Sequence, residues 1–355
     1  MSETMYDYYL SQADYMKKII GNRTALLGKF ADFYAAINPD RIYLVGSGTS
    51  LNSCNAAYAY MEKILGIEVS VIAPSRPCEI RGARPMIIAA SQGGRSTNTI
   101  NYIKKIKEKH LPAVTLTASL DTPLARLADC ALEIGVGDET AGPKTRGYTG
   151  TVLSLYLMAL EAGLRKGLID NDGYDTRLGH LRETAGYGKY NMDACQAFYE
   201  AHRSDLGTAR HYLFVGKGVP AMVANEDALK VLETLCYPSA GYEFEEYLHG
   251  PACCTDAQTA LFIFLSDDED RERMLRLSEI TASATKNSYI ITNDAKLEGD
   301  RILNLKSAPC PFMSPFTDIL LGQLISALLT AELNRSRHPA VKDIFAVMDT
   351  KVPAV

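Results

Sequence analysis

Short apolar runs rich in β-branched residues alternate along this chain with longer segments in which apolar residues recur every three or four positions. Runs of the first kind are typical of strands buried on both faces, and segments of the second kind are typical of amphipathic helices. In the first half, the expected strands are residues 41–45, 69–73, 86–90, 113–117 and 130–134. The alternation therefore predicts an α/β fold built on a parallel sheet that helices cover on both faces.

The second half repeats part of this pattern. Residues 211–218 echo residues 42–48, a helical segment follows over 220–236, and residues 260–265 echo residues 86–90. Such internal repetition predicts a duplicated α/β unit.

Helical periodicity also covers the N-terminus and the middle of the chain. Residues 5–37 are expected to form one or two helices, and residues 147–168 and 171–203 two more that connect the halves. The expected domains are an N-terminal helical arm over 1–39, a first α/β domain over 40–170, a helical connection over 171–204, a second α/β domain over 205–335 and a C-terminal tail over 336–355.

Two polar loops follow expected strands of the first sheet, and each opens a helix. One is Gly46-Ser47-Gly48-Thr49-Ser50, and the other is Ser-Gln-Gly-Gly-Arg-Ser over residues 91–96. Backbone N–H groups at a helix N-terminus and clustered hydroxyls bind anions, and such loops lie side by side at the carboxyl ends of parallel strands. The pair predicts a phosphate monoester site, the alternative being two tight turns capped by Ser or Thr.

Two neighbouring features narrow this interpretation. A dinucleotide site is disfavoured, because its fingerprint needs a small residue where this chain has Leu51 and an acidic residue where it has Pro74 and Ser75. In the second half, the loop at 266–270 is Ser-Asp-Asp-Glu-Asp, which would repel an anion. We expect only the first half to keep its anion loops.

The long polar stretch over residues 137–149 joins an expected strand to an expected helix. It carries Lys144 and Arg146, and its position at the same strand ends predicts a loop that faces the ligand. The alternative is a surface loop that caps the following helix.

In the second half, Glu226, Lys230 and Glu233 fall on one face of the expected helix over 220–236. An exposed charged stripe is the ordinary interpretation of such spacing. However, Glu233 lies among apolar residues, and after an expected turn over 237–241 comes His249, which precedes Gly-Pro and so cannot lie within a helix. A histidine fixed at a helix end near a partly buried carboxylate is a candidate proton-transfer pair. Metal binding is disfavoured, because the segment offers one imidazole and no HExxH motif.

Composition sets limits on the class of protein. The 355 residues include 37 Lys and Arg against 42 Asp and Glu, so no excess of positive charge supports nucleic-acid binding. Eight cysteines without paired-ligand spacing are expected to be buried thiols of a reducing compartment. No apolar stretch is expected to be long enough to span a membrane, and the N-terminus lacks the pattern of a signal peptide, so we expect a cytoplasmic protein.

Together these stretches resemble the sugar isomerase (SIS) domain family over residues 40–355, and most closely the isomerase half of glucosamine-6-phosphate synthase and its stand-alone relatives. Five motifs carry the resemblance in order: a Gly-Thr-Ser loop, a Ser-Gln-x-Gly loop, a Gly-x-Glu loop followed by Tyr-Thr, an Ala-Leu-Lys-x-x-Glu helix, and Leu-His-Gly-Pro. The resemblance implies two tandem SIS domains, each a parallel sheet between helices in a flavodoxin-like three-layer sandwich.

The resemblance also implies site residues. Those expected to bind the sugar phosphate and hydroxyls are Ser47, Thr49, Ser50, Ser91, Gln92 and Ser96, and further candidate substrate-binding positions are Gly48, Gly94, Arg95, Gly142, Lys144 and Arg146.

The catalytic groups implied by the resemblance lie in the second half and in the C-terminal tail. Glu233 matches the base that moves a proton between C1 and C2 of the opened sugar. His249 matches the ring-opening acid and base, which in such enzymes comes from the neighbouring subunit of a dimer. Lys230 and Glu246 match supporting positions, and the tail of such enzymes places a lysine over the sugar, which is expected here to be Lys351, or less closely Lys342.

The chain departs from the family pattern at several positions. Gly93 stands where the family has a phosphate-binding serine and Arg95 where it has a glutamate. Lys144 and Arg146 stand where it has serine and lysine, and Leu248 replaces a lysine. The additional cations suggest a substrate with a second anionic group.

Stand-alone members that resemble this chain include deglycases of phosphorylated sugar-amine adducts such as fructoselysine or glucoselysine 6-phosphate. We therefore expect a cofactor-free deglycase that works as a homodimer with shared sites. Residues 1–40 are too short for a glutaminase domain, so transfer of ammonia from glutamine is not expected. The alternatives are an aldose–ketose isomerase or deaminase of an amino-sugar phosphate, and a sugar-phosphate sensor, which would need neither Glu233 nor His249.

Overall fold

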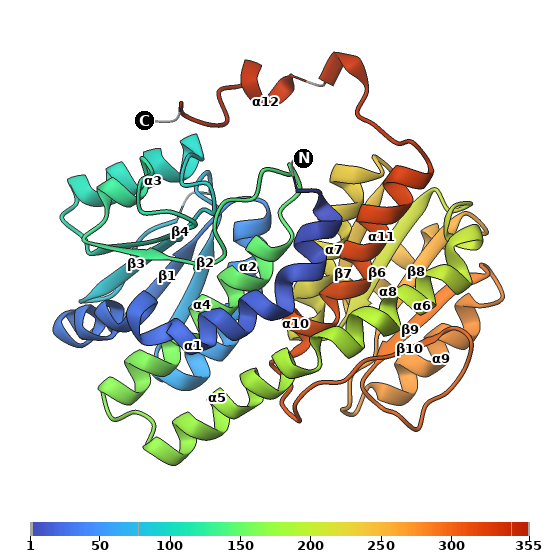
Figure 1. Ribbon diagram of the computed structural model, residues 1–355, viewed down its shortest axis with the longest axis horizontal. Coiled ribbons are helices and arrows are strands. Elements are labelled where there is room, and N and C mark those ends of the chain that lie inside the picture. The colour runs from blue at the N-terminus through green and yellow to red at the C-terminus, as the bar shows by residue number, and fades with distance from the viewer. Residues whose placement is uncertain (1–2, 77, 342, 354–355) are drawn as a thin grey trace. The chain divides into compact units, whose positions relative to one another are not determined.

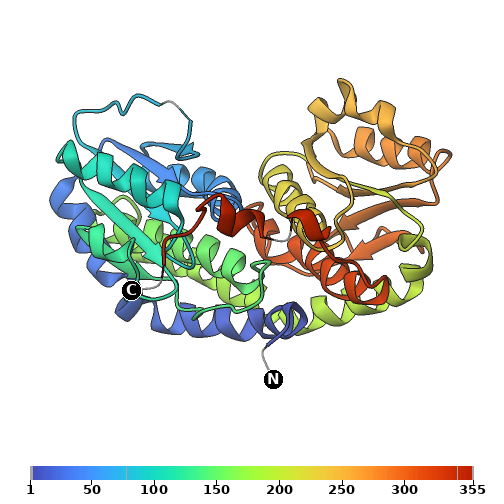
Figure 2. The ribbon, with the colours of Figure 1, turned by 90° about the horizontal axis from the view of Figure 1, so that it is seen from above.

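The computed structural model describes residues 3–76, 78–341 and 343–353. The chain divides into two compact units, and each is described by itself. Unit 1 contains residues 11–182 and the C-terminal segment from 338, and unit 2 contains residues 4–10 and 183–337. Figures 1 and 2 show the ribbon from two directions.

Unit 1 is built on a five-stranded parallel sheet in the order β2-β1-β3-β4-β5. The strands are β1 (Arg41–Val45), β2 (Glu68–Ile72), β3 (Pro85–Ala90), β4 (Ala113–Thr117) and β5 (Cys130–Glu133). All residues of β3 and β4 are buried, as the near-continuous apolar runs predicted for strands covered on both faces. The five expected strands of the first half are confirmed to within a residue or two at their ends.

Helices cover both faces of this sheet (Figure 1). They are α1 (Met5–Ile37), α2 (Thr49–Leu65), α3 (Thr97–Glu108), α4 (Arg146–Arg165) and α5 (Asn171–Gly186). The apolar face of α3, formed by Ile100, Ile103 and Ile106, packs on Tyr43 and Val45 of β1 in one core cluster. Nearly every residue of α4 is buried, because α4 also packs against α2.

Unit 2 repeats this topology. Its five parallel strands have the order β7-β6-β8-β9-β10, which is the order of unit 1 with each strand replaced by its counterpart five places later. The strands are β6 (His211–Gly216), β7 (Ser239–Glu243), β8 (Thr259–Phe264), β9 (Asn287–Thr292) and β10 (Ile302–Asn304). The predicted duplication is confirmed: the chain carries two α/β domains of the same topology in tandem.

The helices of unit 2 surround its sheet in the same way (Figure 1). They are α6 (Gly188–Leu206), α7 (Val219–Thr234), α8 (Phe244–Leu248), α9 (Arg271–Thr281), α10 (Ser314–Thr317) and α11 (Ile319–Glu332). On one face, Met274 and Leu277 of α9 and Phe244 and Tyr247 of α8 pack on the central strands. Helix α7 packs against α11, the counterpart of the contact between α2 and α4.

The structure corrects several expectations about secondary structure. Residues 237–241 are not simply a turn, because the edge strand β7 begins at Ser239. The expected helix over 171–203 is two helices that meet at Tyr187, and the N-terminal arm is a single helix from Met5 to Ile37.

Two expectations from composition also change. Among the eight cysteines, all of them free, Cys54, Cys130 and Cys195 are buried, whereas Cys78, Cys253 and Cys254 are exposed. One segment of the described chain, Ser314–Glu332, is long and apolar enough to cross a membrane by length and composition, with a mean hydropathy of 1.2. Because 67% of its apolar window is buried inside the fold, it fits the pattern of a core helix.

Candidate functional site

The first polar loop of unit 1 is shaped by two glycines. A side chain on Gly46 would bring its Cβ to 2.7 Å from the backbone carbon of Ser50, so only glycine lets β1 pass this close to the start of α2. Gly48 has a φ of 56°, which glycine adopts without strain, and it is the N-cap of α2 without any side-chain cap. This turn sets Ser47, Thr49 and Ser50 at the N-terminus of α2, where an anion is favoured.

The second polar loop is fixed in the same manner. Gly94 has a φ of 57°, and a Cβ there would collide with the side chain of Thr122. The hydroxyls of Ser91 and Ser96 face each other at 3.3 Å. The loop therefore brings two hydroxyls together in front of α3.

The two loops are joined directly. Asn98, in the first turn of α3, donates a hydrogen bond from Nδ2 to Oγ of Ser47 at 2.9 Å. The prediction that these loops lie side by side is thus confirmed by a contact that the sequence did not reveal, because Asn98 belongs to none of the motifs.

Gln92 is buried between these loops and α4. Its side chain is 6% exposed, and neither its amide oxygen nor its amide nitrogen has a hydrogen-bond partner in the described part of the chain. Gly147 packs directly against that amide, since a Cβ on Gly147 would collide with it. A buried amide without partners is costly, and a ligand that hydrogen-bonds to it recovers that cost.

The loop between β5 and α4 is held by an acidic residue that was not singled out as a site residue. Glu139 is buried and accepts hydrogen bonds from the backbone N–H groups of Thr145 and Gly147, so its carboxylate caps the start of α4. Lys144 closes the same loop from the other side, donating from Nζ to the backbone carbonyl oxygen of Glu139 at 2.7 Å. Gly142, between them, has open space where a Cβ would be.

Arg146 lies inside unit 1. It is 4% exposed, its guanidinium stacks over the ring of Tyr15 at 3.8 Å, and Nη1 donates to Oγ of Ser11 at 3.1 Å. Of the three cations considered for a second anionic group, Arg146 is thus the most deeply buried, and both it and Lys144 are engaged by other groups of the protein. Arg95 is half-buried, and within the described chain Nε is the one guanidinium nitrogen that donates a hydrogen bond, to the carbonyl oxygen of Val352 at 2.8 Å.

The C-terminal tail pairs with the second polar loop. The N–H of Thr97 donates to the carbonyl oxygen of Thr350 at 3.1 Å, and the N–H of Val352 donates to the carbonyl oxygen of Arg95 at 2.9 Å. These bonds form an antiparallel bridge between Ser96 and Lys351. Lys351 is thereby placed beside Ser96 of the second polar loop, while Lys342 lies outside the described residues.

In unit 2, the charged triplet of α7 is not an exposed stripe. Glu226 and Lys230 are fully buried, and the side chain of Glu233 is 28% exposed. Lys230 Nζ lies 3.3 Å from Glu226 Oε1 and 3.3 Å from Glu233 Oε2. Burial lowers the pKa of Lys230, but Glu226 and Glu233 outweigh it and the net shift is upward, so the ammonium stays charged beside Glu233.

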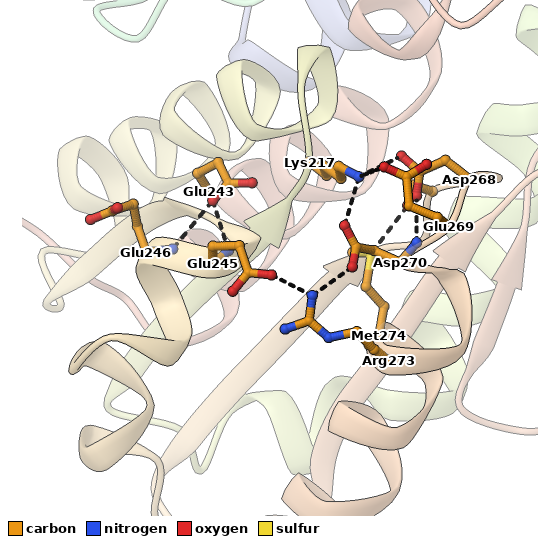
Figure 3. Close-up of polar contacts among 10 residues, drawn as sticks. Lys217, Glu243, Glu245, Glu246, Asp268, Glu269, Asp270, Arg273 and Met274 are labelled. Atoms are coloured by element: carbon orange, nitrogen blue, oxygen red, sulfur yellow. Dashed lines mark hydrogen bonds and ion pairs between the residues drawn. The ribbon is translucent and has the colours of Figure 1, made fainter.

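His249 is the C-cap of the short helix α8, as its position before Gly-Pro predicted. The helix is fixed at its N-terminus by Glu243, whose carboxylate accepts hydrogen bonds from the N–H groups of Glu245 and Glu246. Tyr247 of the same helix is fixed by a hydrogen bond of 2.6 Å between its hydroxyl and the hydroxyl of Thr255. Figure 3 shows the Glu243 cap at the N-terminus of α8 and the bond from Arg273 to Glu245.

His249 and Glu246 are both exposed, and in the described chain the imidazole makes no hydrogen bond or ion pair. Among the described residues, no group of three or more His, Cys, Asp or Glu could hold a metal ion.

Residues 37–161, which include the two joined loops and Gln92, match the SIS domain family. The first α/β domain is a SIS domain. The second α/β domain repeats its strand order, so the chain has two tandem SIS-type folds.

The chain is similar to glutamine–fructose-6-phosphate aminotransferases. It is 26% identical to the enzyme of Bacillus subtilis (strain 168) over 334 residues, covering 90% of this chain and 54% of the relative. It is 24% identical to the enzyme of Caldanaerobacter subterraneus subsp. tengcongensis over 308 residues, covering 82% of this chain and 49% of the relative. The chain therefore spans about half the length of the curated relatives it matches.

Solved structures share the whole tandem SIS architecture. A presumed phosphosugar isomerase from Clostridium difficile 630 is 25% identical, with a TM-score of 0.91 and 99% of both chains covered. The C-terminal domain of the Francisella tularensis glucosamine-fructose-6-phosphate aminotransferase has the same fold at 19% identity, with a TM-score of 0.80 over 93% of this chain and 97% of that domain. Glucosamine-6-phosphate deaminase from Thermotoga maritima shares the fold at 19% identity, with a TM-score of 0.75 and 94% of each chain covered.

Proposed function

We propose that the protein is an enzyme that binds a phosphorylated sugar at the joined loops of its first SIS domain and moves a proton between C1 and C2. The observation that carries the proposal is the buried amide of Gln92, which has no hydrogen-bond partner in the described chain and belongs to one of two joined loops that present hydroxyls and a helix N-terminus. The phosphate binds Ser47, Thr49, Ser50, Ser91 and Ser96, and Gln92 donates to the ligand.

Glu233 is the base in this proposal. Its carboxylate lies 3.3 Å from Lys230 Nζ, and the partial exposure of its side chain leaves it open to a substrate. Glu226, on the other side of Lys230, compensates the buried ammonium when Glu233 gains a proton. His249 opens the sugar ring, and Glu246 supports it from the same helix.

The reaction we favour is deglycation of a 6-phosphorylated sugar-amine adduct. For an adduct with the amine on C1, such as fructoselysine 6-phosphate, Glu233 takes a proton from C1 while the C2 carbonyl oxygen gains one, which gives an enaminol, and a proton returned to C2 gives an imine between C1 and nitrogen. Water adds to C1, and the C1–N bond breaks to release hexose 6-phosphate and the amine. Lys351, placed beside Ser96 by the tail, acts on the carbonyl oxygen.

The cation that would hold an amino-acid carboxylate of such a substrate is Arg95, because its two terminal guanidinium nitrogens have no partner in the described chain. Lys144 is engaged with backbone carbonyl oxygens, and Arg146 with Ser11 and Tyr15. The second candidate reaction is isomerisation or deamination of an amino-sugar phosphate, which the shared fold with a glucosamine-6-phosphate deaminase favours. We further propose a cytoplasmic homodimer.

A turnover assay separates these reactions. The wild type is expected to release lysine and hexose 6-phosphate from fructoselysine 6-phosphate or glucoselysine 6-phosphate, and Glu233→Gln is expected to lose at least about 100-fold in kcat, as for loss of a general base. Arg95→Gln should raise KM for these adducts more than for glucosamine 6-phosphate. Release of ammonia from glucosamine 6-phosphate without any release of lysine would overturn the deglycase in favour of the deaminase.

A further inference from the structure

Unit 2 contains a cavity of about 380 Å³ at the carboxyl ends of its strands. Its walls come from the segments that follow β6, β8, β9 and β10 and from the loop that leads into α10. In parallel α/β sheets, this edge is where ligands bind. Every wall belongs to the second domain, so the cavity is formed without the polar loops of the first.

The internal repeat shows that this cavity corresponds to the phosphate site of the first domain. Val45 pairs with Ala89 across β1 and β3, and Val215 pairs with Ile263 across β6 and β8. Counting two residues on from Val45 and Val215 aligns Ser47 with Lys217. Counting three residues on from Ala89 and Ile263 aligns Gln92 with Ser266, which lines the cavity.

Gly216 and Gly218 repeat the shape of the first loop. A Cβ on Gly216 would lie 2.7 Å from the backbone of Pro220, and Gly218 has a φ of 64°. The turn is therefore preserved, but its hydroxyls are lost: the positions of Thr49 and Ser50 hold Val219 and Pro220. Because the turn is preserved, the space at the strand ends is preserved too. Because the hydroxyls are lost, a different kind of ligand is expected to fit there.

The charge of the cavity has also changed sign. Its cation, Lys217, is engaged by Asp268 at 3.1 Å, Glu269 at 2.9 Å and Asp270 at 2.6 Å (Figure 3). Arg273 also pairs with Asp270, but the charged residues that line the cavity itself are one cation, Lys217, and the carboxyl groups of Asp267, Asp268 and Asp318. A phosphate at this mouth would therefore meet net repulsion.

Deeper in the cavity stand polar groups that can accept hydrogen bonds. Asp318 receives one from the hydroxyl of Thr317 at 2.9 Å, and its other oxygen has no partner among the residues that the structure describes. The hydroxyl of Ser314 is buried and also lacks a partner there. Asp267 lies at the rim, and Val219, Leu265 and Phe312 give the walls an apolar face.

We propose that this cavity is a second ligand site, which takes a small hydroxylated molecule carrying a primary ammonium group and rejects phosphate esters. The ammonium binds the carboxylate of Asp318, and hydroxyls of the ligand bind Ser314 and the rim. The titratable groups that face Asp318 are Asp227 of α7 and Cys195 of α6, and burial raises the pKa of both. Burial raises the pKa of Asp318 to about 7, so binding of a cation strengthens as pH rises from 6 to 8 and the carboxyl of Asp318 ionises. The site stands independently of the reaction proposed for the first domain.

Three matched probes without a carbonyl group test this site by calorimetry at pH 8: 1-amino-1-deoxy-D-glucitol, D-glucitol and D-glucitol 6-phosphate. The amine is expected to bind and the neutral polyol to bind at least about tenfold more weakly. Asp318→Asn should weaken binding of the amine at least about tenfold, and Asn293→Trp, at the exposed mouth, should block it. Asp300→Asn, an exposed aspartate of unit 2 that does not line the cavity, is the matched control and should bind as the wild type does.

Gln92→Ala separates the two sites. It should leave binding of the amine unchanged while weakening D-glucitol 6-phosphate, which we expect to bind the first domain. The proposal is overturned if the amine does not bind, if its binding survives both Asp318→Asn and Asn293→Trp, or if Asn293→Trp abolishes binding of the phosphate ester. If the wild type binds the amine but does not bind D-glucitol 6-phosphate, that result counts against the proposed function of the first domain and not against this site.

Discussion

At the scale of single residues, the buried charges of α7 divide into a compensated pair and an uncompensated carboxyl. Lys230 has a carboxylate on either side, whereas Asp227, next to Glu226, is fully buried with no hydrogen-bond partner for either oxygen in the described chain. Burial raises the pKa of Asp227 well above its usual value, and the charges of Glu226 and Asp318 add to the shift while Lys230 opposes it. Cys195 of α6, a thiol whose own pKa is raised by burial, is a further neighbour.

This carboxyl predicts a particular pH dependence of stability. Because the folded pKa lies above the unfolded one, about 3.9, the contribution of Asp227 is fully present below pH 4 and is lost as pH rises toward the folded pKa. Asp227→Asn removes this dependence, so relative to the wild type its free energy of unfolding should improve by up to about 1.4 kcal/mol per pH unit between pH 5 and 7. Urea denaturation at the two pH values measures this difference.

The isosteric amide of Asp227→Asn keeps the tight contact with Gly322. Because the amide also lacks hydrogen-bond partners, it changes the free energy of unfolding by the same amount at both pH values. The slope, and not the absolute stability, is therefore the diagnostic quantity. Asp300→Asn, fully at the surface, serves as the control. Parallel pH curves for the wild type and Asp227→Asn would show that Asp227 is ionised in the folded protein.

At the scale of elements, the sequence predicted strands and loops where local chemistry and packing agree, and failed where they differ. The runs that became β3 and β4 are buried on both faces, so their composition and their structure match. Strand β7 was missed because Pro238 and Gly241 are typical of a turn. Gly241 has another reason to be glycine: a Cβ there would collide with the backbone of α7 at Ala224 and Asn225.

The tail and the second polar loop form an element that no local pattern could reveal, because their pairing uses backbone groups. Resemblance alone suggested Lys351. Since the pairing does not depend on the side chain, Lys351→Met should keep the tail in place and lower kcat at least about tenfold with little change in KM. Deletion of residues 350–355 removes the bonds to Thr97 and Arg95 as well, and should also raise KM.

Limited proteolysis distinguishes the two variants, since the docked tail of Lys351→Met should resist cleavage as the wild type does and the truncated chain should not. Unchanged turnover in Lys351→Met would remove this lysine from the proposed chemistry. Lys342→Met, at the weaker candidate position, is the matched comparison.

At the scale of the whole chain, the duplicated α/β domain is the property that the sequence predicted best. The differences between the loops of the two copies are what matters for function. The repeated strand order was readable from echoing apolar runs, because burial constrains both copies alike. The loops diverged: the first domain kept hydroxyls and the unpartnered Gln92, while the second gained the carboxylates around Lys217. Tertiary contacts such as the hydrogen bond from Asn98 to Ser47 and those that bury Arg146 depend on partners distant in sequence. The spacing of residues along the chain cannot identify such partners.

The separation of roles between the two domains also argues for a partner chain. His249 and Glu246 are exposed on α8, and in the described chain the imidazole has no partner, as expected of a group that acts in a site completed by a second subunit. If the proposed dimer shares its sites, inactive Glu233→Gln and His249→Ala chains mixed as heterodimers should regain up to about half of the wild-type activity per dimer, since one of the two sites then holds both functional groups. Differently tagged chains, purified through both tags, make this measurable by turnover. Heterodimers as inactive as either parent would mean that each chain supplies both groups to its own site, and α8 would then have to approach α7 of the same protomer.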